Sequence, residues 1–236
     1  GVEFYAEKPA VFMWMQAACM NAFGIGEFAA RLPNALCGAL TLVVLFRIGS
    51  QERDPIFGWL WVIAYVGSIL PHLYFHSGII DPWFNLFIFL GLYTFIRSVR
   101  ERSLRQSILS GALVGLAVMT KGPAAIIIVG LAVFTYWALQ RFKVFFSWAH
   151  IGAMLLSMVF IIALWFGIDL LRHGPDFTVA FFERQVALFT EEDAGHGGFF
   201  GYHFVVLLIG CFPASLFALQ ELLKPKEGWV VKKLGE

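Results

Sequence analysis

Ionisable side chains that could do chemistry stand beside long apolar stretches of this sequence. The first are Glu7 and Lys8, which directly precede an apolar segment over residues 10–23. A charged pair held at the depth of lipid headgroups could bind a lipid phosphate. The alternative is a lysine that lays its stem along apolar surface and keeps its ammonium in water, beside a neighbouring carboxylate. The pattern leaves both interpretations open.

Two further charges mark the ends of apolar runs. Asp81 precedes Pro82, which is typical of a helix start with the carboxylate as N-cap and the proline in the first turn. Ionisable groups at the ends of membrane spans are also candidates for function, and His76 lies close by in the sequence. Lys121 stands in an abrupt Thr-Lys-Gly-Pro turn. It is either a tolerated loop lysine or a cation that requires an anionic partner.

A polar region follows the sixth long apolar stretch. Residues 177–189 predict an amphipathic helix, because apolar and polar side chains alternate with helical spacing. We place Phe181, Phe182, Val186 and Phe189 on one side and Glu183, Arg184 and Gln185 on the other. The next residues include Glu191, Glu192, Asp193 and His196. These could bind zinc or magnesium, although the spacing matches no standard metal site and a solvated acidic loop is the alternative.

The composition determines what elements must position these residues. With 59% hydrophobic residues, 14% charged residues and a mean hydropathy of +0.76, the chain exceeds what a soluble domain tolerates. A bilayer crossing takes roughly 20 mostly apolar residues. We expect seven such spans, at about 33–49, 55–72, 81–97, 107–120, 123–140, 147–170 and 201–222. Long apolar runs without alternation favour helices over a barrel, so the predicted fold class is all-α, a polytopic helical membrane protein.

The distribution of Lys and Arg predicts the orientation of these spans. Most of them fall on one side when the spans alternate, including the group Arg97, Arg100, Arg102 and Arg105. Short loops rich in Lys and Arg are cytoplasmic. The opposite, external side then receives residues 1–32, Asp81, Lys121 and loop 171–200. Most histidines and acids also fall there.

Three regions follow from this topology. Residues 1–32 form an external juxtamembrane segment, whose apolar part at 10–23 is too short to cross and predicts a helix lying in the interface. Residues 33–222 form the transmembrane domain, and 223–236 a basic cytoplasmic tail. The chain begins without Met and ends abruptly, so we expect it to be part of a longer protein.

Several motifs occur in the same order as in one known group of enzymes. They are Glu-Lys-Pro at 7–9 followed by Trp14 and Gln16, Phe-Gly at 23–24, Glu-Phe-Ala-Ala-Arg-Leu-Pro at 27–33, Met-Thr-Lys-Gly-Pro at 119–123 and Asp-Ala-Gly-His at 193–196. This run resembles bacterial membrane glycosyltransferases of the GT-C fold, protein-mannosyltransferase-like and aminoarabinose-transferase-like, which use polyprenyl-phosphate sugars. The resemblance covers nearly the whole chain and the N-terminal half or so of such enzymes.

The resemblance implies inverting transfer of a sugar from a polyprenyl phosphate to a lipid A, protein or glycan acceptor on the external face of the inner membrane. Lys8, Lys121 and Arg184 would bind the donor phosphate, and Asp81 would match the second acidic position of the family. Glu7 and His196 would help to hold a divalent metal, zinc or magnesium. Fixed cations lower the barrier because the leaving phosphate gains negative charge, and a carboxylate can activate the acceptor as general base.

The family's expected catalytic base is an aspartate on the first external loop, before the Glu-Lys-Pro run. This chain begins after that point, so we expect it to be inactive as given.

Two other classes of function remain to be weighed. A transporter or flippase for an anionic lipid-linked substrate would place charges near the middle of spans and would show paired broken helices. A structural membrane subunit would tolerate alanine at Lys8, Asp81 and Lys121 with effects on stability alone. In this sequence the charges cluster at the external ends of the spans, which favours the enzyme.

Overall fold

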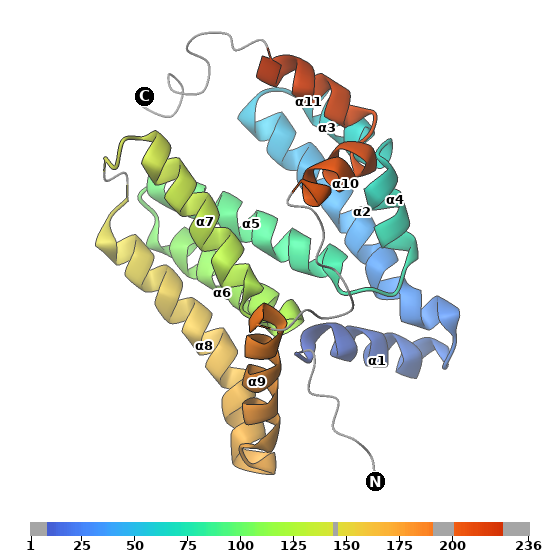
Figure 1. Cartoon of the computed structure of the whole chain (residues 1–236), viewed down its shortest axis with the longest axis vertical. Helices are drawn as coiled ribbons and strands as arrows, with labels where there is room; N and C mark the ends of the chain where they lie inside the picture. Colours follow the sequence, from blue (N-terminus) through green and yellow to red (C-terminus); the bar gives the residue numbers. More distant parts are fainter. Residues whose placement is uncertain (1–8, 144–145, 191–200, 224–236) are drawn as a thin grey trace. The chain divides into compact units, whose positions relative to one another are not determined.

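The computed structural model describes residues 9–143, 146–190 and 201–223, and the regular elements in these ranges are all helices, joined by short turns and loops (Figure 1). This confirms the predicted all-α class. The chain divides into two compact units, residues 1–37 with 78–196 and residues 38–77 with 197–236. Helix α2 (Glu27–Glu52) runs from the first unit into the second.

The first unit contains most of the predicted functional residues. Besides the start of α2, its helices are α1 (Val11–Phe23), α5 (Asp81–Arg100), α6 (Leu104–Lys121), α7 (Ala124–Leu139), α8 (Trp148–His173) and α9 (Asp176–Thr190). The second unit contains the rest of α2, α3 (Pro55–Val66), α4 (Ile69–His76), α10 (Tyr202–Gly210) and α11 (Ala214–Leu223).

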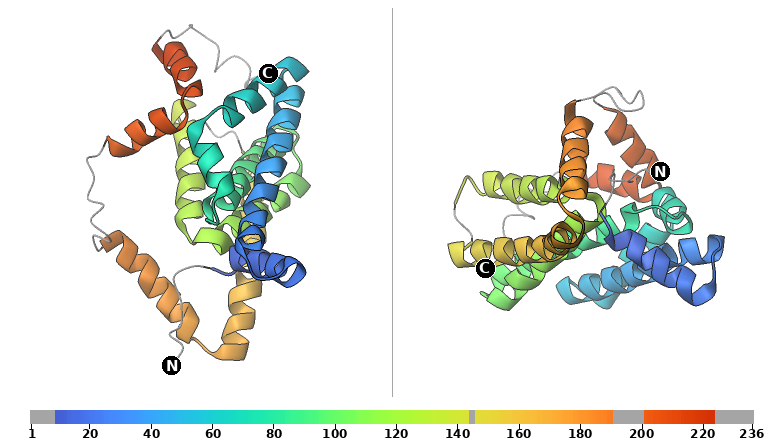
Figure 2. Two further views of the ribbon diagram at one scale, coloured as in Figure 1. Left: turned by 90° about the vertical axis from the view of Figure 1, so that its right-hand side faces the viewer. Right: turned by 90° about the horizontal axis from the view of Figure 1, so that it is seen from below.

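Small residues let α6 pack closely between α5 and α8, which lie on either side of it (Figures 1 and 2). The Ser110 hydroxyl donates to the Gly91 carbonyl of α5 at 2.7 Å. On the other side, a Cβ on Gly111 would overlap the backbone carbonyl of Met154, and the Ser157 hydroxyl donates to the Ile108 carbonyl at 2.8 Å. Close approach through Gly and Ser is typical of helix pairs in membranes.

The ends of several helices follow from local sequence. Asp54 caps α3 by accepting from the backbone N–H of Phe57 at 2.8 Å, and Pro55 occupies the first turn. Helix α1 starts just after Pro9, as predicted for the segment over residues 10–23. It ends at Gly24, whose φ of +85° an L side chain rarely adopts.

Within the described residues, three helices are long and apolar enough to cross a membrane: α2, α5 and α8. The pair α3 and α4, bent by 69°, adds a fourth if it forms one span. All seven predicted spans coincide with helical residues, but α7 has only 16 residues and α6 carries polar residues at both of its ends. The stretch 201–222 is divided into α10 and α11 around Pro213.

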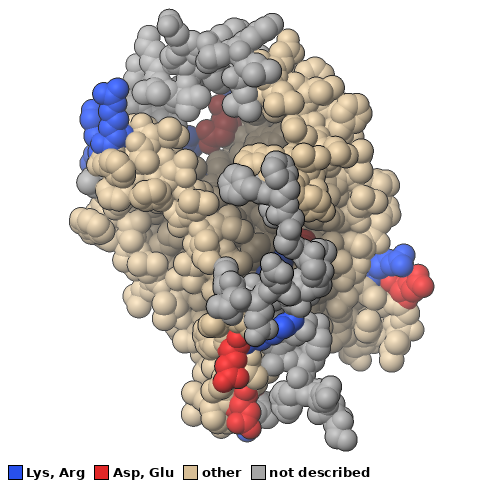
Figure 3. Space-filling view, in the orientation of Figure 1, with Lys and Arg blue, Asp and Glu red and all other residues tan. Residues whose placement is uncertain are grey.

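The surface suits an apolar solvent. Large apolar side chains with more than half of their surface exposed include Ile63, Phe160 and Leu207. On the face shown in Figure 3, uncharged residues predominate and charged ones are few. The described residues thus present a largely apolar, uncharged surface, as contact with lipid requires.

Candidate functional site

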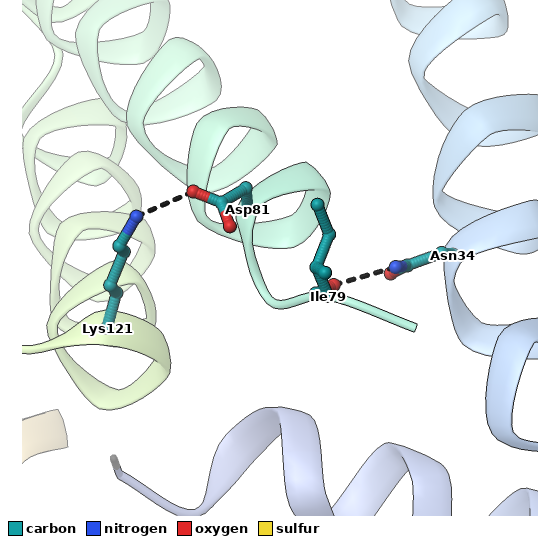
Figure 4. A network of polar contacts seen from close by, with 4 residues as sticks. All are labelled: Asn34, Ile79, Asp81 and Lys121. Carbon is teal, nitrogen blue, oxygen red and sulfur yellow. Dashed lines mark hydrogen bonds and ion pairs between the residues drawn. The ribbon is translucent and has the colours of Figure 1, made fainter. Parts of the chain in front are cut away.

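Asp81 and Lys121 form an ion pair across the ends of two antiparallel helices. Nζ of Lys121 lies 2.6 Å from Oδ1 of Asp81 (Figure 4). Asp81 is the first residue of α5 and Lys121 is the last residue of α6. The structure therefore brings together two of the residues that the sequence singled out. It also identifies an anionic partner for Lys121.

The pair explains what the Asp81 carboxylate does. One sequence interpretation made it the N-cap of its own helix. In the structure the cap position of α5 is Ile80, with no side-chain hydrogen bond to the helix start, and Asp81 lies within the helix. The capping interpretation is therefore wrong, because the carboxylate turns away from its own backbone to meet Lys121 on α6.

Helix α2 holds the turn that leads into Asp81. The Asn34 side chain, which is fully buried, donates from Nδ2 to the carbonyl of Ile79 at 2.7 Å (Figure 4). One residue earlier, the Pro33 carbonyl accepts from the indole N–H of Trp83 at 3.1 Å. These two bonds fix the chain on both sides of Asp81. The backbone at Asp81 is therefore held in place independently of Lys121.

Lys121 is positioned by a tightly packed helix end. Thr120, immediately before it, is fully buried and donates its hydroxyl to the Leu116 carbonyl at 2.7 Å. Immediately after it, Gly122 ends the helix with φ +100° and donates its N–H to the Val118 carbonyl at 2.7 Å. The ammonium also lies 5.5 Å from the centroid of the Phe84 ring, a cation–π distance.

Both partners of the ion pair remain accessible. The side chain of Lys121 is 40% exposed and that of Asp81 is 28% exposed. A pair this exposed contributes little to stability, about 0.2–1 kcal/mol. A phosphate could therefore displace the Asp81 carboxylate from Lys121, since a phosphate oxygen is a better partner for an ammonium ion than a solvent-screened carboxylate.

The helix α9 brings a further part of the predicted site to the turn after Lys121. Helices α8 and α9 are joined in a hairpin through Gly174, whose φ is +84° (Figure 2). Arg184 lies on α9 and is half-buried. The helix contacts Gly122 through Phe181 and Gln185.

The buried face of α9 differs from the predicted one. Phe181 and Gln185 are buried, whereas Phe182 and Val186 are more than half exposed. The sequence assignment was wrong because it grouped the aromatic residues together. Residues four apart share a helix face, so burial of Phe181 brings Gln185 in with it.

The remaining predicted residues lie outside the described ranges. These are Glu7, Lys8 and His196, together with the acids at 191–193. Pro9, the first described residue, is fully buried, and Val11 packs in the same apolar cluster as Phe84 and Met119. Within the described ranges, no group of three or more His, Cys, Asp or Glu could hold a metal ion. The divalent metal remains a prediction that rests on Glu7 and His196.

Two residues of the site were not singled out from the sequence. Asn34 could have been noticed, because it is a polar amide directly after a proline within an apolar run. Gln185 was assigned to the solvent side of its helix. Only the packing of α9 on Gly122 reveals its buried position.

Solved structures identify the architecture. The chain superimposes on the crystal structure of ArnT from Cupriavidus metallidurans bound to undecaprenyl phosphate with a TM-score of 0.79 and 22% sequence identity, over 93% of this chain and 41% of that one. The apo structure of the same protein gives a TM-score of 0.73 at 23% identity. The arrangement of the helices thus defines a polytopic membrane protein with the GT-C-type fold of ArnT.

The family follows from the sequence comparison. Residues 7–166 match the family described as dolichyl-phosphate-mannose-protein mannosyltransferase, and the chain belongs to this family. It is 30% identical, over 95% of its length, to an undecaprenyl phosphate-alpha-4-amino-4-deoxy-L-arabinose arabinosyl transferase of Edwardsiella ictaluri, and 26% identical to that of Yersinia enterocolitica. It spans 41% of the length of each of these relatives. The resemblance stated from the motifs is confirmed.

Proposed function

We propose that this chain forms the donor-binding part of a glycosyltransferase that takes a sugar from a polyprenyl phosphate. The observation that carries the proposal is the accessible Asp81–Lys121 pair at one end of the α5–α6 helix pair. An ammonium ion placed at a span end, next to apolar surface, suits a ligand with a phosphate head and an isoprenoid tail. The fold shared with ArnT, solved with undecaprenyl phosphate, supports the same ligand class.

The side of the membrane follows from the placement of charge. Lys121 lies at the opposite end of α6 from Arg105 and the arginines that precede this helix. If those arginines are cytoplasmic, the Asp81–Lys121 pair faces the periplasm. The proposed site of transfer is therefore the periplasmic face of the bacterial inner membrane.

The chemistry proposed for the site is a single displacement at the anomeric carbon. The acceptor oxygen forms the new bond as the bond to the donor phosphate oxygen breaks, and the leaving phosphate takes the electron pair. Lys121 stabilises the charge that develops on the phosphate. When the phosphate occupies Lys121, the Asp81 carboxylate is released from its ion pair. The proton of the acceptor group passes to the carboxylate that the family resemblance expects as catalytic base, the aspartate of the first external loop.

The placement of charge also bears on the transporter alternative. That reading expects charges near the middle of spans. The Asp81–Lys121 pair joins helix ends, and the described part of α6 between Ser107 and Thr120 carries no ionisable side chain. This arrangement favours a reaction at the membrane surface over a path through the membrane.

Binding of undecaprenyl phosphate to the purified chain in detergent tests the proposal. Loss of a charge-assisted hydrogen bond costs about 1.5–3 kcal/mol, so we expect Lys121→Ala to raise Kd by about tenfold or more. Arg105→Ala, on the first turn of the same helix, is the matched control and should bind as wild type. Lys121→Arg should restore part of the affinity. Equal affinities of Lys121→Ala and Arg105→Ala, at equal thermal stability, would refute the proposal.

A further inference from the structure

Gln185 is a buried carboxamide beside the turn that carries Lys121. Its exposed fraction is 7%, and it lies on the face of α9 that also buries Phe181. A Cβ on Gly122 would lie 2.8 Å from Oε1 of Gln185 and 3.2 Å from its Cδ. The carboxamide therefore occupies the space that any side chain at position 122 would need.

The close approach is built from both sides. Gly122 combines φ +100° with direct contact to α9, so the turn accepts no residue with a Cβ without strain or displacement of the helix. Phe181, 1% exposed, lies one helical turn before Gln185, and its Cζ would lie 3.4 Å from the same added Cβ. Phe181 thus supplies the apolar anchor of α9 on the turn, and Gln185 adds polar atoms beside it.

An anchor alone would not require a glutamine. Methionine has nearly the same shape and would fill the same space without polar atoms that need hydrogen bonds. A carboxamide carries two N–H donors and one acceptor. Its oxygen is the atom nearest to position 122, and its N–H donors are the groups that a phosphate held by Lys121 can use.

We propose that Gln185 is a binding residue for the phosphate head of the lipid donor. Its N–H group donates to a phosphate oxygen held by Lys121, while Phe181 and Gly122 keep α9 in place. This inference rests on the proposed function, because it takes Lys121 as the phosphate-binding cation. In this proposal α9 binds the phosphate head of the donor directly, in addition to its role in packing against the turn after Lys121.

The experiment compares binding of undecaprenyl phosphate and of undecaprenol to the purified chain in detergent. For Gln185→Met we expect a Kd for undecaprenyl phosphate raised about tenfold, from the loss of one hydrogen bond to a charged group. The Kd for undecaprenol should not change, because undecaprenol carries no phosphate. The thermal unfolding temperature should stay equal to or above that of wild type. Val179→Ala, a half-exposed position on the same helix, is the control and should leave both affinities unchanged.

Two further variants separate the possible results. Gln185→Glu keeps the shape of the side chain and should weaken phosphate binding more than Gln185→Met does, because its negative charge repels the phosphate. If Gln185→Met fails to fold, Gln185→Glu alone tests whether Gln185 binds the phosphate. Lys121→Ala reports on the proposed function in the same assay. If Lys121→Ala loses binding and both Gln185 variants bind as wild type, the inference about Gln185 is wrong and the lysine site stands. If Lys121→Ala also binds as wild type, the proposed function itself fails.

Discussion

Replacement of Asp81 by asparagine should strengthen binding of the donor phosphate. In the structure, Oδ1 of Asp81 lies 2.6 Å from Nζ of Lys121. A phosphate must therefore displace the carboxylate before it can pair with the ammonium ion. Asparagine keeps nearly the same shape but has no charge, so it competes less for the lysine and does not repel the phosphate.

The exposure of Asp81 and Lys121 sets an upper limit on the change in Kd that Asp81→Asn can cause. With side chains 40% and 28% exposed, the pair is of the solvent-screened kind, worth about 0.2–1 kcal/mol. Release of that interaction corresponds to a decrease in Kd of up to about fivefold, since 1.4 kcal/mol is tenfold. The free energy of unfolding should fall by no more than about the same 1 kcal/mol. The turn before Asp81 keeps its own bond from Asn34 to Ile79.

The assay is titration of the purified chain with undecaprenyl phosphate at low and at high salt, for wild type, Asp81→Asn and Lys121→Ala. The expected order of affinity is Asp81→Asn, then wild type, then Lys121→Ala. The difference between the first two should shrink at high salt, because exposed charges are screened. If Asp81→Asn weakens binding as much as Lys121→Ala does, the carboxylate organises the lysine instead of competing with the phosphate, and the reasoning is refuted.

Three further changes test how the structure positions the pair. Gly111→Ala should lower the free energy of unfolding by about 1–3 kcal/mol or more, because its Cβ would overlap the Met154 backbone. The control is Gly152→Ala, whose added Cβ has nothing within 4 Å; it should be neutral or stabilising by up to about 1 kcal/mol. Thermal unfolding measures both variants. Asn34→Ala should remove the bond to Ile79 and cost about 1–3 kcal/mol, and limited proteolysis should show faster cleavage in the turn before Asp81; equal cleavage of mutant and wild type would contradict the assigned role. Gly122→Ala should weaken undecaprenyl phosphate binding more than Gly130→Ala, whose added Cβ has open space; equal Kd values for the two variants would contradict the importance of the contact with Gln185.

Much of the fold could be predicted because lipid imposes simple requirements on sequence. Apolar length and Lys and Arg bias placed the helices and put Asp81 and Lys121 on one side, and the ion pair between α5 and α6 agrees with that placement. Breaks inside apolar runs could not be predicted. Examples are the break between α10 and α11 around Pro213 and the bend between α3 and α4. Hydropathy averages over about 20 residues, so it does not detect a change in direction within a run.

The site was predictable in its charges and less so in the groups that hold them. Asp81 and Lys121 stand out because charge is rare in this sequence, yet the carboxylate was equally compatible with a helix cap. Its true partner depends on how α5 packs against α6, which no local pattern records. Gln185 was misassigned for a related reason. Three polar residues in a row appear solvent-facing, but consecutive residues on a helix point about 100° apart, so one of the three can face inward.

The register between α5 and α6 is what makes the charge pair possible. Asp81 and Lys121 belong to different helices, and the bond between Ser110 and Gly91 lies several turns away from them along the same interface. A slip of one helical turn would move one end past the other by about 5.4 Å, which is more than an ion pair tolerates. Gly91 lets the two helices approach closely, because a Cβ there would lie 2.8 Å from Val114 of α6, and the serine bond fixes their relative height. The chemistry proposed for the membrane surface is therefore set by packing inside the membrane domain. Substitutions along this interface should change donor binding even where no residue touches the donor.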